Sequence, residues 1–134
     1  MKKIVYLDMD GTIADLYGQQ AWLQQLELET EGLFLKCEPF ITEAILYEYF
    51  PVEKYELRIC SMTPPNASKK YCQMVIAEKN QWLDKFFPTI QMRIYLPYGL
   101  DKNLNDESIY HVLVDDNEKI RKSFKGVAIS PPWL

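Results

Sequence analysis

The sequence has few of the residues on which several common kinds of site depend. Its 134 residues include one histidine, His111, and three cysteines, Cys37, Cys60 and Cys72, whose spacing matches no CxxC metal motif. An odd number of cysteines also suits a reducing compartment. We therefore expect no zinc site, and His111, which lies in an apolar run, is expected to have no metal or catalytic role.

The sequence also lacks long runs of basic residues and long runs of apolar residues. The formal net charge is −4, and basic residues form only short pairs such as Lys2-Lys3 and Lys69-Lys70, whereas a polynucleotide groove needs clustered positive charge. No apolar segment approaches membrane-spanning length, and the apolar run at residues 4–7 is too short for an export signal. We expect no polynucleotide partner, no membrane partner and a cytoplasmic location.

What the sequence does contain is an alternation of short apolar runs and helical patterns. The length fits a single domain, residues 1–134, and 48% of the residues are apolar, enough for a normal core. Runs bounded by turn residues predict strands, and apolar residues repeated every three to four positions predict helices. The predicted strands are residues 4–7, 57–60, 92–96, 111–114 and 127–129, and the predicted helices are residues 16–29, 40–49, 73–86 and 118–124. Within the second helix, Phe40, Ala44, Ile45 and Tyr49 fall on one side.

Strands that alternate with helices predict an α/β fold with a parallel sheet. Right-handed crossovers bring the carboxyl ends of the strands to one edge, where ligands bind. Polar residues follow three of the predicted strands: Asp8 and Asp10 the first, Ser61 the second, and Asp115 and Asp116 the fourth. We expect these side chains to meet in one crevice.

Four carboxylates at one sheet edge would repel one another by several kcal/mol, so a cation should accompany them. Mg²⁺ suits such oxygen ligands, because it binds few carboxylates and keeps water and phosphate oxygens in its shell. We expect Asp8, Asp10 and Asp116 to hold this Mg²⁺, with Asp115 acting directly or through water.

A phosphate monoester bound there needs an in-line nucleophile, charge neutralisation and a proton for the leaving alcohol. Asp8 is placed to attack phosphorus and form an aspartyl-phosphate. Asp10, two residues on, can protonate the leaving oxygen and then activate water. Gly11 allows the tight turn between them and the next element. Ser61, with Thr63 as a lesser rival, and a lysine would bind the phosphoryl oxygens.

Three segments, in order, resemble the motifs of the haloacid dehalogenase-like (HAD) phosphohydrolases. Asp8-Met9-Asp10-Gly11-Thr12 resembles the DxDGT signature, Ile59-Cys60-Ser61 resembles motif II, and Val114-Asp115-Asp116-Asn117 resembles the acidic motif IV. The resemblance spans the chain from Asp8 to Asn117. It implies an HAD-like core, a Rossmann-like parallel sheet flanked by helices, with Met9 and Gly11 among the phosphate-binding residues.

A narrower resemblance is to the 5'(3')-deoxyribonucleotidase branch of that superfamily. The opening DMDGTIAD, residues 8–15, is similar to its DMDGVLAD, EKNQWLDKF, residues 78–86, to its EKxxWhxKxF segment, and LVDD, residues 113–116, to its LIDD. The match implies that Lys79 is the phosphate-binding lysine of motif III. Lys102, in a DK pair that recurs in the branch, is the second candidate and Lys85 the third. Members of the branch are typically dimeric, which implies a homodimer.

The branch carries a helical cap inserted after the first motif, which helps to form the nucleoside pocket. Here the interval leaves room only for a reduced cap of about residues 16–36, called the cap segment below. Leu16 stands where the branch commonly has an aromatic residue that stacks on the base. Trp22, Phe34 or Tyr17 could stack instead, although Trp22 and Phe34 also suit core or subunit contacts.

Asp15 and the tail at residues 130–134 each allow more than one interpretation. Asp15 could be a ligand, but we favour a role as the N-cap of the helix that follows it. The tail at residues 130–134, which contains two prolines and a tryptophan, is rigid and apolar. It could pack on the sheet edge or mediate self-association.

Three functions fit these observations. The first is Mg²⁺-dependent hydrolysis of a nucleoside monophosphate. The second is an HAD phosphatase for a sugar phosphate or a phosphoprotein, which the small cap would admit. The third is a phosphoacceptor or binding module without turnover, as in receiver domains. In those domains the adjacent acidic pair follows the first strand, whereas here Asp115 and Asp116 come late and Asp10 supplies an acid.

Overall fold

The computed structural model describes residues 1–134, with every side chain except that of Asp106. Its main sheet has five parallel strands in the order β5-β4-β1-β6-β7. This confirms the predicted α/β class with a Rossmann-like sheet flanked by helices. The strands are β1 (Lys3–Leu7), β4 (Tyr55–Met62), β5 (Arg93–Leu96), β6 (Val112–Val114) and β7 (Val127–Ile129).

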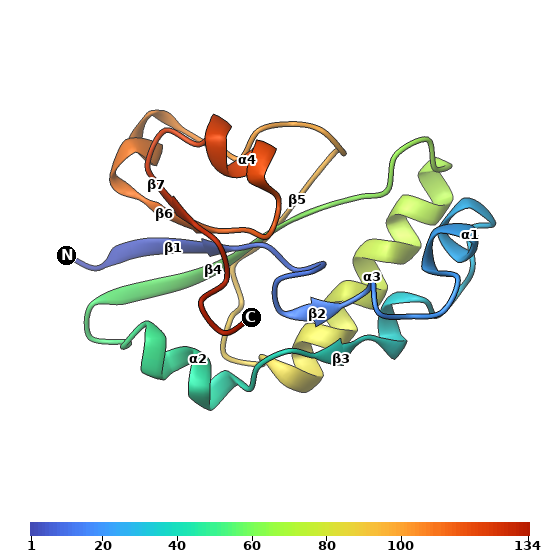
Figure 1. Cartoon of the computed structure of the whole chain (residues 1–134), viewed down its shortest axis with the longest axis horizontal. Helices are drawn as coiled ribbons and strands as arrows, with labels where there is room; N and C mark the ends of the chain where they lie inside the picture. Colours follow the sequence, from blue (N-terminus) through green and yellow to red (C-terminus); the bar gives the residue numbers. More distant parts are fainter.

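Helices cover both faces of the sheet. α2 (Glu43–Tyr49) and α3 (Lys69–Phe86) lie on one side of the strands and α4 (Glu118–Ser123) on the other (Figure 1). Successive side chains of a strand point to opposite faces, so Val5 and Leu7 join the core under α2 and α3, while Tyr6 joins the core under α4. The strands are apolar on both faces because both are buried.

The order of the strands creates a switch point next to β1. From β1 the chain moves to β4 and then β5 on one side, whereas β6 and β7 are added on the other side. In open α/β sheets, ligands bind where the strand order reverses, beyond the carboxyl ends of the strands. The gap between the ends of β1 and β6 is therefore the expected position of a site.

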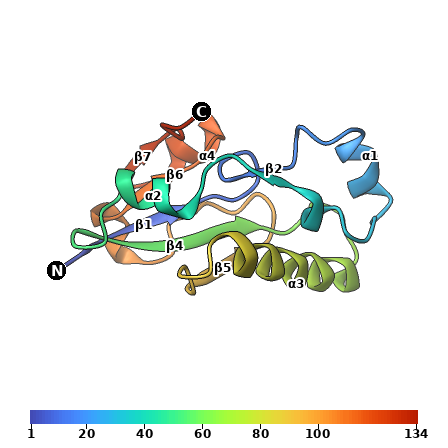
Figure 2. The same ribbon diagram turned by 90° about the horizontal axis from the view of Figure 1, so that it is seen from below.

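The cap segment is less helical than predicted. A two-stranded antiparallel pair, β2 (Ala14–Asp15) and β3 (Glu38–Pro39), closes its base, and between them lie α1 (Trp22–Glu27) and the 3-10 helix η1 (Phe34–Lys36). The prediction of a helix over residues 16–29 is wrong at both ends. Figure 2 shows α1 beyond the carboxyl ends of the strands, near one end of α3.

Local backbone geometry explains why the helix begins late. The Asp15 carboxylate accepts the N–H of Gly18 at 2.8 Å, which forms a turn. Ala21 then adopts a left-handed conformation, with φ of 54°, that a right-handed helix cannot include. Asp15 therefore caps a turn, and the prediction that it caps the helix is wrong.

The other helices differ mainly in their boundaries. α2 begins at Glu43 because the Thr42 hydroxyl accepts the N–H of Ile45. The side shared by Phe40, Ala44, Ile45 and Tyr49 faces solvent, and the buried residues are Leu46 within the helix and Ile41 and Phe50 at its ends. α3 begins at Lys69, before the predicted start, because Ser68 caps it. A further 3-10 helix, η2 (Asp106–Tyr110), precedes β6.

The three cysteines are free thiols, and two of them, Cys37 and Cys60, are buried. A search of the helices within the described residues finds none with the length and apolarity needed to cross a bilayer.

Candidate functional site

Aspartates from both ends of the chain meet at the switch point. Asp8 follows β1, and its N–H donates to the carbonyl of Val114, the last residue of β6, at 2.9 Å. Asp115 and Asp116 follow directly. One carboxylate oxygen from each of Asp8, Asp115 and Asp116 lies within 4.8 Å of the others. We call these three residues the carboxylate cluster.

In the turn at residues 9–14, three backbone N–H groups share one carbonyl acceptor. The N–H groups of Thr12, Ile13 and Ala14 donate to the carbonyl of Met9 at distances of 3.1, 3.0 and 2.9 Å. Gly11 has φ of 82°, and a Cβ at this position would collide with Oδ2 of Asp116. The turn therefore needs glycine both for its conformation and for its closeness to the carboxylate cluster.

Thr12 links two members of the cluster. Its Oγ1 lies 3.0 Å from Oδ2 of Asp8 and 3.2 Å from Oδ1 of Asp116, and it accepts the Asp116 N–H at 3.2 Å. A hydroxyl carries one hydrogen, so it can donate to only one of the two carboxylates at a time. Thr12 was not predicted as a site residue, although its place beside Gly11 in the DxDGT segment was a signal.

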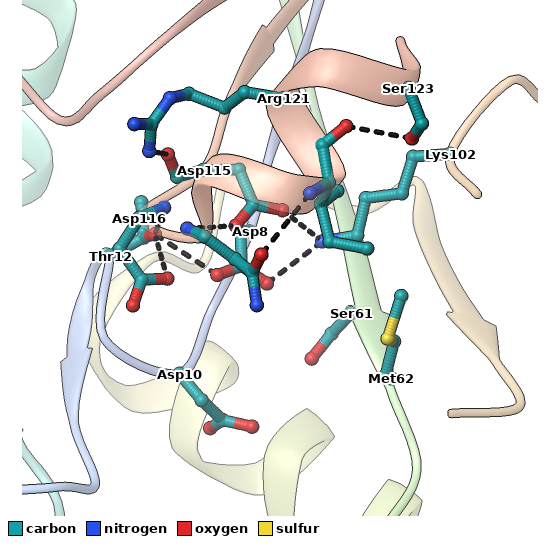
Figure 3. Close-up of polar contacts among 12 residues, drawn as sticks. Asp8, Asp10, Thr12, Ser61, Met62, Lys102, Asp115, Asp116, Arg121 and Ser123 are labelled. Atoms are coloured by element: carbon teal, nitrogen blue, oxygen red, sulfur yellow. Dashed lines mark hydrogen bonds and ion pairs between the residues drawn. The ribbon is translucent and has the colours of Figure 1, made fainter. Parts of the chain in front are cut away.

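Lys102 is the lysine that contacts Asp8. Its Nζ lies 2.9 Å from Oδ1 of Asp8 and 2.8 Å from Oδ2 of Asp115, with the lysine side chain 1% exposed (Figure 3). Burial opposes the charge of Lys102, but Asp8 and Asp115 more than offset it and raise its pKa above the ordinary value. Burial likewise disfavours ionised Asp8, yet Lys102 and a hydrogen bond with Asp116 hold the pKa of Asp8 below its ordinary value.

Lys79, the first candidate from the sequence, has a different set of partners. Its Nζ lies 2.8 Å from each of three oxygens: Oδ2 of Asp10, Oγ of Ser61 and the carbonyl of Met62. The lysine is fully buried and lies 5.0 Å from the centre of the Phe34 ring. Lys85, the third candidate, is exposed and lies over the Phe86 ring.

Asp10 stands apart from the carboxylate cluster and faces Lys79. Burial raises the pKa of Asp10 above its ordinary value, and Lys79 only partly offsets this effect. Within the described residues, Oδ1 of Asp10 is buried and has no hydrogen-bond partner. A buried polar oxygen without a partner is costly unless a bound molecule completes it.

The cluster has the character of a site for a small divalent cation. Asp116 is exposed, but partial desolvation, together with the nearby Asp8 and Asp115, raises its pKa to about 7. Both oxygens of Asp115 already accept hydrogen bonds, from Lys102 and from the Asn117 N–H. Both oxygens of Asp8 likewise face donors, Lys102 and Thr12, so hydrogen bonding does not rank the members of the cluster as ligands. Three carboxylate oxygens with space for water and phosphate suit Mg²⁺.

A cavity of about 220 Å³ lies over these residues. Its polar side includes Asp8, Asp10, Lys102 and Asp116, and its apolar side comes largely from the cap segment. All three residues predicted for the substrate pocket line it: Leu16, Trp22 and Phe34. Tyr17 also lines it and packs edge-on against Trp22, with ring centres 4.8 Å apart. Contributions from Pro64, Pro65, Tyr98 and Ile120 were not predicted.

Comparison with known proteins adds no family. A scan against protein-family models finds no match to this chain, and a search of the curated proteins finds none either. The fold class therefore rests on the parallel sheet itself, and the assignment to the HAD phosphohydrolases is a proposal.

Proposed function

We propose that this protein is a Mg²⁺-dependent phosphomonoester hydrolase of the HAD superfamily, with Asp8 as the nucleophile. One observation carries the proposal. The Asp8 carboxylate directly follows the central strand β1, lines a cavity, and is held by Lys102 at 2.9 Å and by Thr12 at 3.0 Å beside Asp116. An ionised carboxylate fixed in this way is prepared to attack phosphorus.

The first step forms a bond between an Asp8 oxygen and phosphorus and breaks the bond from phosphorus to the ester oxygen. Asp10 donates the proton that the leaving alcohol needs, and its raised pKa supports this role. In the second step Asp10 takes a proton from water, the water oxygen bonds to phosphorus, and inorganic phosphate leaves Asp8. Mg²⁺ held by Asp8 and Asp116 would neutralise charge on the phosphoryl group.

The two buried lysines have separate tasks in this proposal. Lys102 keeps Asp8 ionised and takes the place of the motif III lysine, because it is the lysine in contact with the nucleophile. Lys79 orients Asp10 and holds the Ser61 hydroxyl. Lys79 and Ser61 are buried and do not line the cavity, whereas Thr63, the lesser candidate for the phosphoryl oxygens, does line it. The N–H of Gly11 already donates to the Ala14 carbonyl at 2.9 Å, which makes it a weaker candidate for phosphate binding.

The leaving group that fits best is flat and largely apolar. The cap segment lines the cavity with Leu16, Trp22 and Phe34, which suits stacking on a base. The hydroxyl groups of a sugar phosphate would find few partners there. We therefore favour a nucleoside monophosphate over a sugar phosphate. A phosphoprotein substrate and a phosphoacceptor without turnover are outcomes that the experiment below distinguishes.

The test is a panel of nucleoside monophosphates, sugar phosphates and phosphopeptides, with inorganic phosphate measured in Mg²⁺ and in EDTA. We expect many turnovers on nucleoside monophosphates, loss of release in EDTA and recovery when Mg²⁺ is returned. Turnover that persists in EDTA would contradict the metal-dependent mechanism. Labelling that stops at one phosphate per chain would favour the phosphoacceptor.

A further inference from the structure

The C-terminal tail, residues 130–134, contacts the turn that follows β1. β7 ends at Ile129, and from there the chain runs back toward β2, where the C-terminus lies (Figure 1). Nε1 of Trp133 donates a hydrogen bond of 2.8 Å to the carbonyl oxygen of Thr12, 121 positions earlier in the chain. Residues 130–134 therefore reach the turn that carries Asp10, Gly11 and Thr12.

This carbonyl has a particular need for an outside donor. Thr12 is fully buried, and a buried carbonyl without a partner costs free energy. Within the turn, the N–H groups of Thr12, Ile13 and Ala14 all donate to Met9, and that of Gly11 donates to Ala14. The donors of the turn are thus used on other acceptors, and the Trp133 indole supplies the bond to Thr12.

Trp133 is itself fixed by packing. Its ring lies edge-on to Tyr49 of α2, with ring centres 5.6 Å apart, and it packs against the main core. Pro131 is buried, and Pro131 and Pro132 restrict the freedom of the tail. The N–H of Leu134 closes a turn on the Pro131 carbonyl at 3.3 Å. The indole donor is therefore held at a defined place.

We propose that Trp133 is a positioning residue for the carboxylate cluster. The carbonyl and the hydroxyl that matter belong to the same residue: the Thr12 carbonyl is held by Trp133, while Thr12 Oγ1 lies between Asp8 and Asp116. Fixing the backbone of Thr12 keeps its hydroxyl between the two carboxylates. The effect on turnover rests on the proposed function, whereas the order of the turn and Mg²⁺ binding are measurable without it.

The deciding variant is Trp133→Phe, which keeps a ring against Tyr49 and removes the indole N–H. We expect hydrogen exchange of the amides at residues 11–14 to become about tenfold faster, the scale of one hydrogen bond. Mg²⁺ should bind several-fold more weakly by calorimetry, and kcat should fall while KM changes little. Leu134→Ala, at a side chain that is 62% exposed, is the matched control in the tail and should change none of these values.

A second variant removes the hydrogen bond from residue 133 to the Thr12 carbonyl while keeping the shape of the tryptophan ring system. Peptide ligation can install 3-benzothienylalanine at position 133, where sulfur then replaces the indole N–H. It should reproduce the Trp133→Phe changes. Exchange rates within twofold of wild type in both variants would overturn the proposal, and so would faster exchange with unchanged Mg²⁺ affinity and kcat. If the wild-type protein releases no phosphate, the proposed function fails, and exchange and Mg²⁺ affinity still decide the role of Trp133.

Discussion

The carboxylate cluster and the cap segment line the same cavity but are held in different ways. Around the cluster, Asp8, Thr12, Lys102 and Asp115 are buried, and each makes at least two polar contacts. In the cap segment, α1 has six residues, none of them buried, and no side-chain cap. The four buried residues around the cluster are therefore fixed, while the part of the cavity wall that α1 provides is weakly held.

The cap segment is not uniform either. Its second half is tied to α3, where the buried carboxylate of Glu78 accepts the N–H groups of Gly32 at 2.8 Å and Phe34 at 3.2 Å. The first half, which carries α1, is exposed at Leu23 and Leu28. In the proposed mechanism, attack on phosphorus and selection of the leaving group should therefore respond to different mutations.

The largest effect is expected for Asp8→Asn in the cluster. The change keeps the shape of the side chain but removes the nucleophile, so phosphate release should fall by at least about a thousandfold. Release is measured on the best substrate of the panel, with circular dichroism as the check that the variant is folded. Residual activity above one per cent of wild type would show that another group attacks phosphorus.

The next largest effects are expected for substitutions of the two buried lysines. Lys102→Met leaves two carboxylates, Asp8 and Asp115, without their cation, and breaking a buried pair typically costs about 3–5 kcal/mol of unfolding free energy. Lys79→Met leaves one carboxylate, Asp10, and two neutral acceptors, Ser61 and the Met62 carbonyl. A smaller loss is expected, because only Asp10 is charged and its side chain is 19% exposed. Urea unfolding of both variants in EDTA measures the difference. Equal losses would contradict the view that the cluster is the more tightly held region.

Alanine substitution of one glycine in each region tests how tightly the local backbone is held. Gly11→Ala meets both a positive φ and a collision with Asp116, whereas Gly32→Ala meets a positive φ of 86° with no atom within 4 Å. The left-handed conformation alone costs roughly 1–2 kcal/mol. Both variants should lose about that much, and Gly11→Ala should lose more and should also bind Mg²⁺ more weakly. Thermal unfolding with and without Mg²⁺ measures both effects. Equal losses of stability and equal stabilisation by Mg²⁺ in the two variants would contradict the predicted difference.

The smallest effect is expected for Trp22→Ala in the cap segment. Loss of one stacking ring costs about 1–3 kcal/mol per base, so KM for a nucleoside monophosphate should rise about tenfold. Hydrolysis of a small aliphatic phosphate ester should be unchanged, because it does not reach Trp22. Leu28→Ala, at an exposed side chain of the same segment, is the control. A fall in kcat for both substrates would mean that the cap segment also supports the chemistry.

How far the sequence could anticipate this site depends on the kind of contact. Asp8 and Asp115 follow apolar strands, and parallel strands place their carboxyl ends together, so their meeting was predictable. The choice between Lys79 and Lys102 was not, because both lie far from Asp8 in sequence and only the tertiary fold decides which one reaches it. The hydrogen bond from Trp133 to Thr12 left no sequence signal. The short α1 was missed because the left-handed Ala21 overrides its helical pattern.

Helix α3 supports both the cap segment and Asp10. Glu78, which anchors the cap segment, is followed directly by Lys79, which holds Asp10 and Ser61. Adjacent residues on one helix move as a unit, so a displacement of α3 that releases Gly32 also draws the ammonium group away from Asp10. In the proposed mechanism, the anchor of the cap segment and the support of the proton donor would therefore be linked through a single peptide bond.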